Sequence, residues 1–190
     1  MKKAIQLLGM FSIILFVSCS GNDGFDGRDG VDGRDGSDGL DGISAQVFEV
    51  DGVNFDFEAD NNWFATRLTF NDFTNFEILE SDAILVYRFD GEVELSDGPA
   101  NNWSLIPQNF FVSQGTLQYT FAHNFVDMDL FIDGNFDMAT LSDDFTQNQF
   151  FRIVILPGDF LSSKLDKSNM AAVLSAINVD EESIARISMK

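Results

Sequence analysis

The chain has very few of the side chains from which most metal and nucleophilic centres are built. It contains a single cysteine, Cys19, and a single histidine, His123. One cysteine excludes an intrachain disulfide, so the folded part must be held together by its core alone. One histidine and one cysteine cannot assemble a zinc site of the usual nitrogen and sulfur ligands, and no Gly-x-Ser-x-Gly motif presents a nucleophile. We therefore predict no cofactor, no metal centre and no enzymatic activity.

Basic residues are also scarce. Eleven Lys and Arg stand against 31 Asp and Glu, which gives a net charge of −20, or −22 once Lys2 and Lys3 leave with an N-terminal signal. A chain of this charge repels nucleic-acid phosphates and anionic lipid surfaces. The charge therefore excludes nucleic acid as a partner.

The abundant carboxylates leave two weaker hypotheses open. Most glycosidases use a pair of carboxylates, so a carboxylate-dependent hydrolase remains the weakest functional alternative. Asp143-Asp144, and Asp127 with Asp129, are candidates for one structural calcium ion because calcium prefers oxygen ligands. Acidic residues in turns and on solvent-facing strand positions usually only interact with water, and we favour that interpretation.

The first 18 residues have the features of an export signal. Lys2 and Lys3 precede an apolar run from Ala4 to Val17, and Ser18 is a small residue before Cys19. The run is too short to span a bilayer, which needs about 20 apolar residues. A basic start, a short apolar segment and a small residue at the cleavage point are typical of a secretory signal.

The residues around Cys19 resemble a bacterial lipobox, here Phe16-Val17-Ser18-Cys19. The resemblance implies cleavage before Cys19, a diacylglyceryl thioether on its sulfur and a third acyl chain, such as palmitate, on its amine. Several acyl chains together give stable anchoring, so the membrane is an expected partner. Ser20 in place of Asp favours the outer membrane, on its periplasmic or cell-surface face. The alternative is an ordinary cleaved signal in which the cysteine has no role.

A three-residue repeat follows the cysteine. From Gly21 to Gly42, glycine stands at every third position and Asp precedes the next glycine in every triplet. Only glycine fits at the axis of a triple helix, and the stretch resembles the collagen-like segments of bacterial surface proteins. It contains no proline, however, and three aligned chains would bring many like charges together. We favour an extended spacer in a monomeric chain, with a trimer through this stretch as the alternative. The resulting domain boundaries are 1–18, 19–43 and 44–190.

Residues 44–190 show the period-two pattern of strands with one buried face. Val53, Phe55 and Phe57 alternate with polar residues, and so do Met128, Leu130 and Ile132. A further alternation includes Leu117, Tyr119, Phe121 and Phe125, which would place His123 in or beside the core. Two runs, Ala83 to Phe89 and Phe150 to Leu156, are apolar at nearly every position and predict central strands buried on both faces. Pairs such as Asp90-Gly91 suggest tight hairpin turns.

These strands predict an all-β domain, an antiparallel β-sandwich or a jelly-roll-like barrel. One short helix is expected near the end, with Ser168 as its N-cap and an apolar face that includes Met170, Val173 and Ile177. Residues 184–188 are predicted to return as a last strand.

The whole chain resembles a group of uncharacterised bacterial lipoproteins with collagen-like repeats. Its members have an acylated cysteine, a short Gly-X-Y stretch and a β-rich domain, which ends with a late strand, a Pro-Gly-Asp-Phe turn and a short helix. The corresponding parts here are Cys19, Gly21 to Gly42, the segment Ile153 to Phe160, and the helix near Ser168. The resemblance implies a displayed β-domain and no particular reaction.

Two similar tripeptides are the strongest candidates for a ligand site. Trp63 follows Asn61-Asn62, and Trp103 follows Asn101-Asn102. Exposed tryptophan beside amides is suited to stacking on sugars and hydrogen-bonding them, so Trp63, Trp103, Asn62 and Asn102 are candidate glycan-binding residues. The alternative places both tryptophans in the core. The leading hypothesis is thus a lipid-anchored envelope protein that displays a non-enzymatic β-domain for adhesion or envelope structure, with a glycan-binding module on the same anchor as the alternative.

Overall fold

The computed structural model describes residues 45–75, 77–96, 98–158, 160 and 164–189. The export signal, Cys19 and the triplet stretch lie outside the described residues. None of the helices within the described part has the length and apolar character that a membrane crossing requires.

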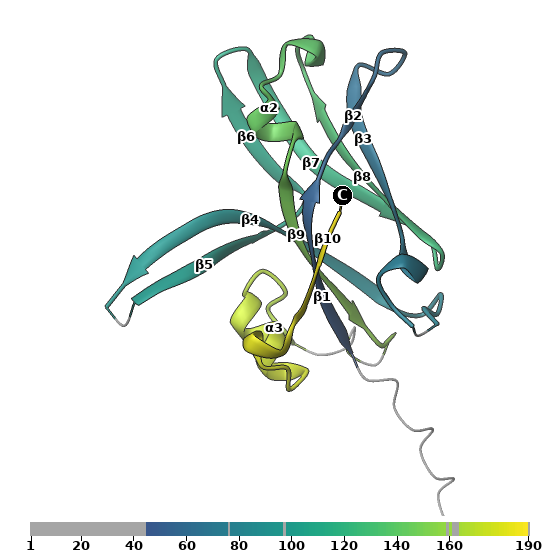
Figure 1. The fold of residues 1–190 in the computed structure, drawn as a ribbon, viewed down its shortest axis with the longest axis vertical. Coiled ribbons are helices and arrows are strands. Elements are labelled where there is room, and N and C mark those ends of the chain that lie inside the picture. The colour runs from purple at the N-terminus through teal and green to yellow at the C-terminus, as the bar shows by residue number, and fades with distance from the viewer. Residues whose placement is uncertain (1–44, 76, 97, 159, 161–163, 190) are drawn as a thin grey trace, which may run out of the picture. The chain divides into compact units, whose positions relative to one another are not determined.

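Within the described residues ten strands form two five-stranded sheets, and the predicted all-β sandwich is confirmed (Figure 1). Sheet A has the order β10-β1-β9-β4-β5, with β1 (Gln46–Val53), β4 (Ala83–Leu95), β5 (Gly98–Leu105), β9 (Gln149–Leu156) and β10 (Ala185–Ser188). Sheet B has the order β2-β3-β8-β7-β6, with β2 (Asp56–Glu58), β3 (Trp63–Thr69), β6 (Gln108–Val112), β7 (Gly115–His123) and β8 (Asp127–Gly134). All neighbours are antiparallel except β1 and β10, which are parallel.

Short helical segments lie between the strands. They are η1 (Phe70–Asp72), η2 (Met138–Thr140), α2 (Asp143–Thr146), α3 (Met170–Ala176) and η4 (Glu181–Ser183). The expected late helix is α3, but its N-cap is Asn169, whose side chain accepts a hydrogen bond from the Ala172 amide. The prediction of Ser168 was one residue too early, because Asn is as good a cap as Ser. The expected last strand is β10.

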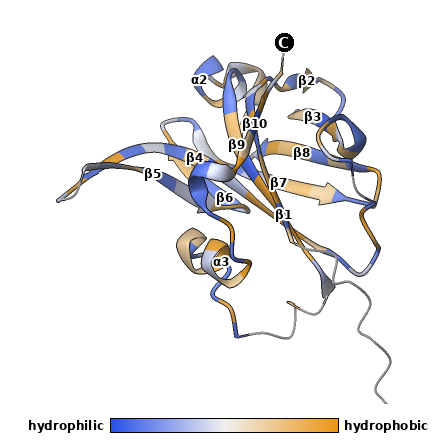
Figure 2. Cartoon of the chain, turned by 60° about the horizontal axis from the view of Figure 1, so that its bottom comes forward, coloured by the Kyte–Doolittle hydropathy of each residue, from blue (hydrophilic) through white to orange (hydrophobic). Residues whose placement is uncertain are grey.

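The main core lies between the two sheets. Alternate residues of strands such as β7 and β8 are buried between the sheets, and Figure 2 shows hydrophobic colouring on both strands. The buried residues of this core include Phe48, Val50, Leu68, Val86, Leu117, Tyr119, Met128, Leu130, Ile132, Phe151 and Ile153. Because the removal of apolar surface from water is the main favourable term in folding, this layer holds the two sheets together.

Sheet A is buried on its outer face as well. Leu85 and Tyr87 of β4, with Val154 of β9, pack in a second cluster together with Val173 of α3. The Tyr87 hydroxyl donates to the Lys167 carbonyl and so ties the segment before α3 to the sheet. This second layer explains why β4 and β9 read as apolar at nearly every position, and it confirms both as central strands.

Three local predictions were wrong. The alternation from Val53 to Phe57 predicts one strand, but β1 ends in sheet A and β2 begins in sheet B. Between them the Phe55 amide donates to the Thr146 carbonyl. Gly91 does not make a hairpin turn, because β4 continues through it with a bulge and a positive φ of 98°. Phe125 lies beyond the end of β7 and is 54% exposed.

Candidate functional site

The two candidate tryptophans have different environments. Trp103 lies on the outer face of sheet A and is 8% exposed. Phe89 and Phe150 contact its ring, with centroid distances of 5.4 and 5.0 Å, and the Arg152 guanidinium lies 4.2 Å above it. Trp103 is therefore a core residue, whereas Asn101 and Asn102 before it are exposed. This tripeptide is not part of an open site.

Asn62 also has a structural role. Its backbone has a positive φ of 54°, a conformation that Asn tolerates better than most residues. Its side-chain amide donates to the Phe136 carbonyl at 2.9 Å and accepts from the Met138 amide at 3.0 Å. Asn62 therefore holds the β2–β3 turn against the segment that follows β8.

Trp63 is the member of the predicted set that lies on an open surface. It is half-buried on the outer face of sheet B, where its ring contacts Phe131 of β8 at a centroid distance of 5.2 Å and an angle of 49°. The two rings border a hollow of about 350 Å³. The residues that line it are Asp56, Glu58, Asn61, Trp63, Ala65, Thr66, Arg67, Asp129 and Phe131.

The strand register explains why a hollow forms here. Ala65 pairs with Phe131 on one side and with Asp56 on the other, so a small side chain stands between larger ones. In the same way Arg67 pairs with Asp129, and Glu58 pairs with Trp63. Side chains at alternate positions of neighbouring strands share one face. The lining therefore comes mainly from three rigid strands.

The floor and walls of the hollow carry fixed charges. Arg67 donates from Nε and Nη2 to the two carboxylate oxygens of Asp129, at 2.6 and 2.9 Å. These hydrogen bonds lower the pKa of Asp129 and raise the pKa of Arg67. Asp56 and Glu58 on β2 are exposed, and no ion pair joins them to another residue that the structure describes. The hollow thus combines two aromatic rings, one neutralised ion pair and two carboxylates.

Polar side chains extend this face across the sheet. Thr120 of β7 pairs with Phe131, and Gln118 pairs with Asp133. The Gln118 amide donates to the Asn109 side chain of β6 at 2.8 Å. Hydroxyl and amide groups therefore continue from the aromatic rings toward the far edge of sheet B, which suits an elongated polar ligand.

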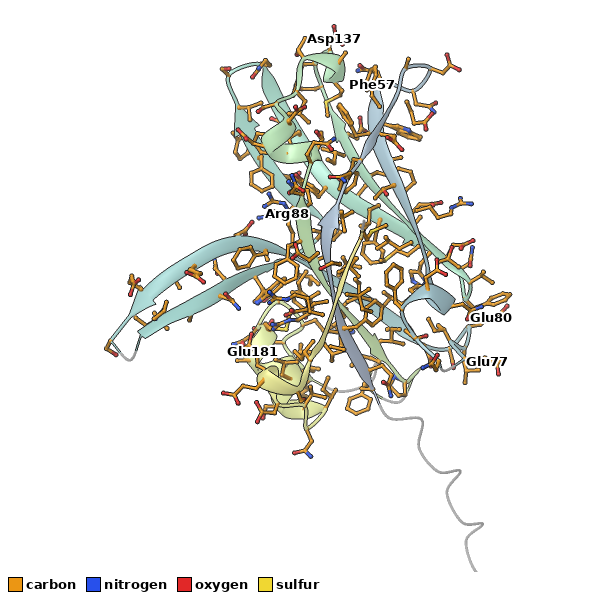
Figure 3. The ribbon with its side chains drawn as sticks, viewed as in Figure 1. Phe57, Glu77, Glu80, Arg88, Asp137 and Glu181 are labelled. Carbon is orange, nitrogen blue, oxygen red and sulfur yellow. The ribbon has the colours of Figure 1, made fainter. Side chains whose placement is uncertain are left out.

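Other hollows lie at the opposite end of the sandwich. One of about 500 Å³ lies among loop residues that include Asn71, Glu77 and Phe125. A smaller one of about 280 Å³ is lined by Glu80 and His123, among others. Figure 3 shows Glu77 and Glu80 at this end and Phe57 of β2 at the other. These cavities are built from loops and strand ends, whereas strands hold the side chains around Trp63.

His123 is exposed at the end of β7, where its ring stacks on Phe121 with centroids 6.0 Å apart. His123 was predicted to lie in or beside the core; it is not in the core, but it lies beside Phe121, which packs against the core.

The acidic pairs proposed for calcium have other roles. Asp129 binds Arg67, and Asp127 accepts from the Thr69 hydroxyl at 3.0 Å. Asp143 and Asp144 form the first turn of α2, a favourable place for negative charge. Within the described ranges, no three His, Cys, Asp or Glu side chains are grouped so that they could hold a metal ion.

Several site residues were missed in the sequence, although a signal was present. Asp129 and Phe131 alternate with the buried Met128, Leu130 and Ile132, so their outward direction was readable. The sequence does not show that β2 and β3 lie beside β8, and this pairing is what brings Asp56, Glu58 and Trp63 to Phe131.

Comparisons of the chain with protein-family models, with curated proteins and with solved structures find no match.

Proposed function

We propose that this chain is a lipid-anchored protein of the bacterial outer membrane whose β-sandwich domain binds a glycan and catalyses no reaction. Acyl chains on Cys19 hold it to the membrane, and the triplet stretch separates the domain from the lipid. Glycan binding is then the means of adhesion. The observation that supports the proposal is the hollow at Trp63 and Phe131 on the outer face of sheet B.

The chemistry of the hollow suits a sugar. A pyranose ring has C–H groups on its faces, which pack on an aromatic ring, and hydroxyl groups around its edge, which need hydrogen-bond partners. Trp63 and Phe131 offer the aromatic surface, and Asp56, Glu58 and Asn61 offer oxygen and amide groups around it. Ligand sites typically combine apolar contact with a few directed polar groups in this way.

Binding is favoured over hydrolysis by the arrangement of the carboxylates. Asp56 and Glu58 are two positions apart on β2, so they approach a bound sugar from the same side. Glycosidases place two carboxylates on either side of the bond that is cleaved, and one of them must keep its proton. Asp129 faces the other side, but Arg67 lowers its pKa, which makes it a poor proton donor near neutral pH.

A glycan array followed by calorimetry tests the binding. We expect the chain to bind at least one oligosaccharide, and Trp63→Ala to weaken that binding by tenfold or more, which is about 1.4 kcal/mol. Phe125→Ala is the matched control, because Phe125 is an aromatic residue beyond the end of β7, is 54% exposed and does not line the hollow. Binding to no glycan, or equal weakening by both substitutions, would refute the proposal.

Membrane fractionation tests the anchor separately. Cys19→Ala should release the protein from membranes, since the acyl chains supply the attachment. Retention of the variant in the membrane fraction after a high-salt wash would show that something else holds it there.

A further inference from the structure

The charged residues that line the Trp63 hollow indicate which class of sugar it binds. We propose that it binds glycan units that carry a free amine, and that it discriminates against acidic sugars; this inference rests on the glycan-binding function proposed above. The carboxylates of the lining are Asp56, Glu58 and Asp129, and its only cation is Arg67.

The Arg67–Asp129 ion pair neutralises one positive and one negative charge of the lining. Both carboxylate oxygens of Asp129 accept hydrogen bonds from Arg67, so this pair is close to neutral for a ligand. Asp56 and Glu58 remain as two negative charges on one wall. Any cation that enters the hollow meets them without competition from a protein cation in the lining.

The position of the two carboxylates is fixed by their strand. Phe57 lies between them, is 38% exposed and pairs with Phe64 of β3, with the two ring centroids 5.1 Å apart. Side chains alternate along a strand, so Asp56 and Glu58 share the face opposite to that of Phe57. Glu58 pairs directly with Trp63, which brings a carboxylate and the larger aromatic ring to the same part of the hollow.

An ammonium group on a sugar fits this pairing in two ways. The face of a tryptophan ring attracts cations, and a carboxylate makes a stronger hydrogen bond to a charged donor than to a hydroxyl. A uronic acid unit places its negative charge against the same wall and against a chain whose net charge is −20. The expected order of affinity is therefore free amine, then acetylated amine, then carboxylate.

The test compares three hexasaccharides on the full chain in detergent solution by calorimetry. They consist of glucosamine, N-acetylglucosamine or galacturonic acid. One contact between unit charges at about 4 Å in water corresponds to about fivefold in affinity, so we expect at least that preference for glucosamine over its acetylated form at low salt. In 1 M NaCl the preference should largely disappear, because the Debye length falls to about 3 Å.

Two double variants assign the preference to the hollow. Asp56→Asn with Glu58→Gln should abolish the preference for glucosamine but retain binding of the acetylated hexamer. Glu92→Gln with Glu94→Gln is the matched control, since these exposed residues have the same spacing on β4, in the hairpin that projects from sheet A (Figure 1). We expect the control to keep the preference.

The outcomes separate this inference from the function on which it rests. Equal affinity for the amine and acetylated hexamers, or an equal effect of the two double variants, overturns the amine preference and leaves glycan binding intact. Failure of every neutral and amino oligosaccharide to bind, here and on the array, overturns both.

Discussion

Replacement of Glu49 by Gln is expected to destabilise the domain strongly. Arg152 is 1% exposed, and its Nε and Nη2 donate to Glu49 Oε1 at 3.1 and 2.6 Å. Its Nη2 also reaches Glu181, a half-exposed residue of η4, at 2.7 Å. Nη1 has no hydrogen-bond partner among the residues that the structure describes. The buried guanidinium therefore depends on Glu49 for most of its compensation.

The size of the effect follows from burial. Removal of one partner from a buried ion pair typically costs 3–5 kcal/mol because the other charge is left without compensation. Glu181 remains as a partial substitute and Gln keeps the shape of Glu, so we expect the lower end, about 3 kcal/mol. With a urea m value of about 2 kcal/mol per molar, the unfolding midpoint moves down by about 1.5 M.

Two other substitutions serve as comparisons. Arg186 also binds Glu49, at 2.8 Å, but its side chain is 52% exposed. Arg186→Gln should cost about 1 kcal/mol or less, as exposed ion pairs do. The double replacement Glu49→Met with Arg152→Met should recover most of the loss, because an apolar pair leaves no buried charge.

Urea unfolding of residues 20–190, followed by tryptophan fluorescence, measures the three variants and the unsubstituted chain. Trp103 reports directly because the Arg152 guanidinium lies over its ring. If Glu49→Gln costs no more than Arg186→Gln, Arg152 does not depend on Glu49 and the reasoning fails.

Three further predictions concern other parts of the chain. Burial raises the pKa of Tyr119 to about 12, above the ordinary value of about 10, so its contribution to stability is complete below pH 10 and is lost as the pH rises toward 12. Tyr119→Phe should therefore show a shallower alkaline loss of stability in thermal melts, and an unchanged slope would contradict this. Residues 44–190 alone should fold as a β-rich unit, and a circular dichroism spectrum of helix or disorder would show otherwise. Residues 20–190 should sediment as a monomer at pH 7; a trimer that dissociates on deletion of Gly21 to Gly42 would favour the collagen-like alternative.

The strands of the fold were largely readable from the sequence. Met128, Leu130 and Ile132 alternate with polar residues, and all three are buried in β8. The apolar runs around Ile84 and Ile153 became the central strands β4 and β9. A strand that is buried on one face has apolar residues at every second position, and a strand that is buried on both faces has them at nearly every position. Both patterns can be recognised in the sequence.

The two tryptophans show what could not be predicted from the local sequence. Trp63 and Trp103 both follow an Asn-Asn pair, yet one borders an open hollow and the other is buried. The difference comes from residues far away in the sequence. Trp103 packs in an apolar cluster that also contains Val173 of α3, whereas the Trp63 ring contacts Phe131 of β8 on the open outer face of sheet B. No local pattern carries that information, so the sequence could not distinguish the tryptophan beside the hollow from the buried one. Phe131 and the β2 carboxylates depend on the same long-range pairing.

The position of β1 in sheet A has a mechanical consequence. A pulling force applied through the residues before the domain acts on β1 at Gln46, its first residue. Within sheet A, β1 lies between β9 and β10. Its hydrogen bonds to both neighbours lie across the strand, so a force along β1 shears them together and cannot open them one by one from an edge. The parallel pairing with β10 also directs the C-terminal strand away from the point where the load enters (Figure 1). Such a geometry resists extension far better than a peripheral hairpin would.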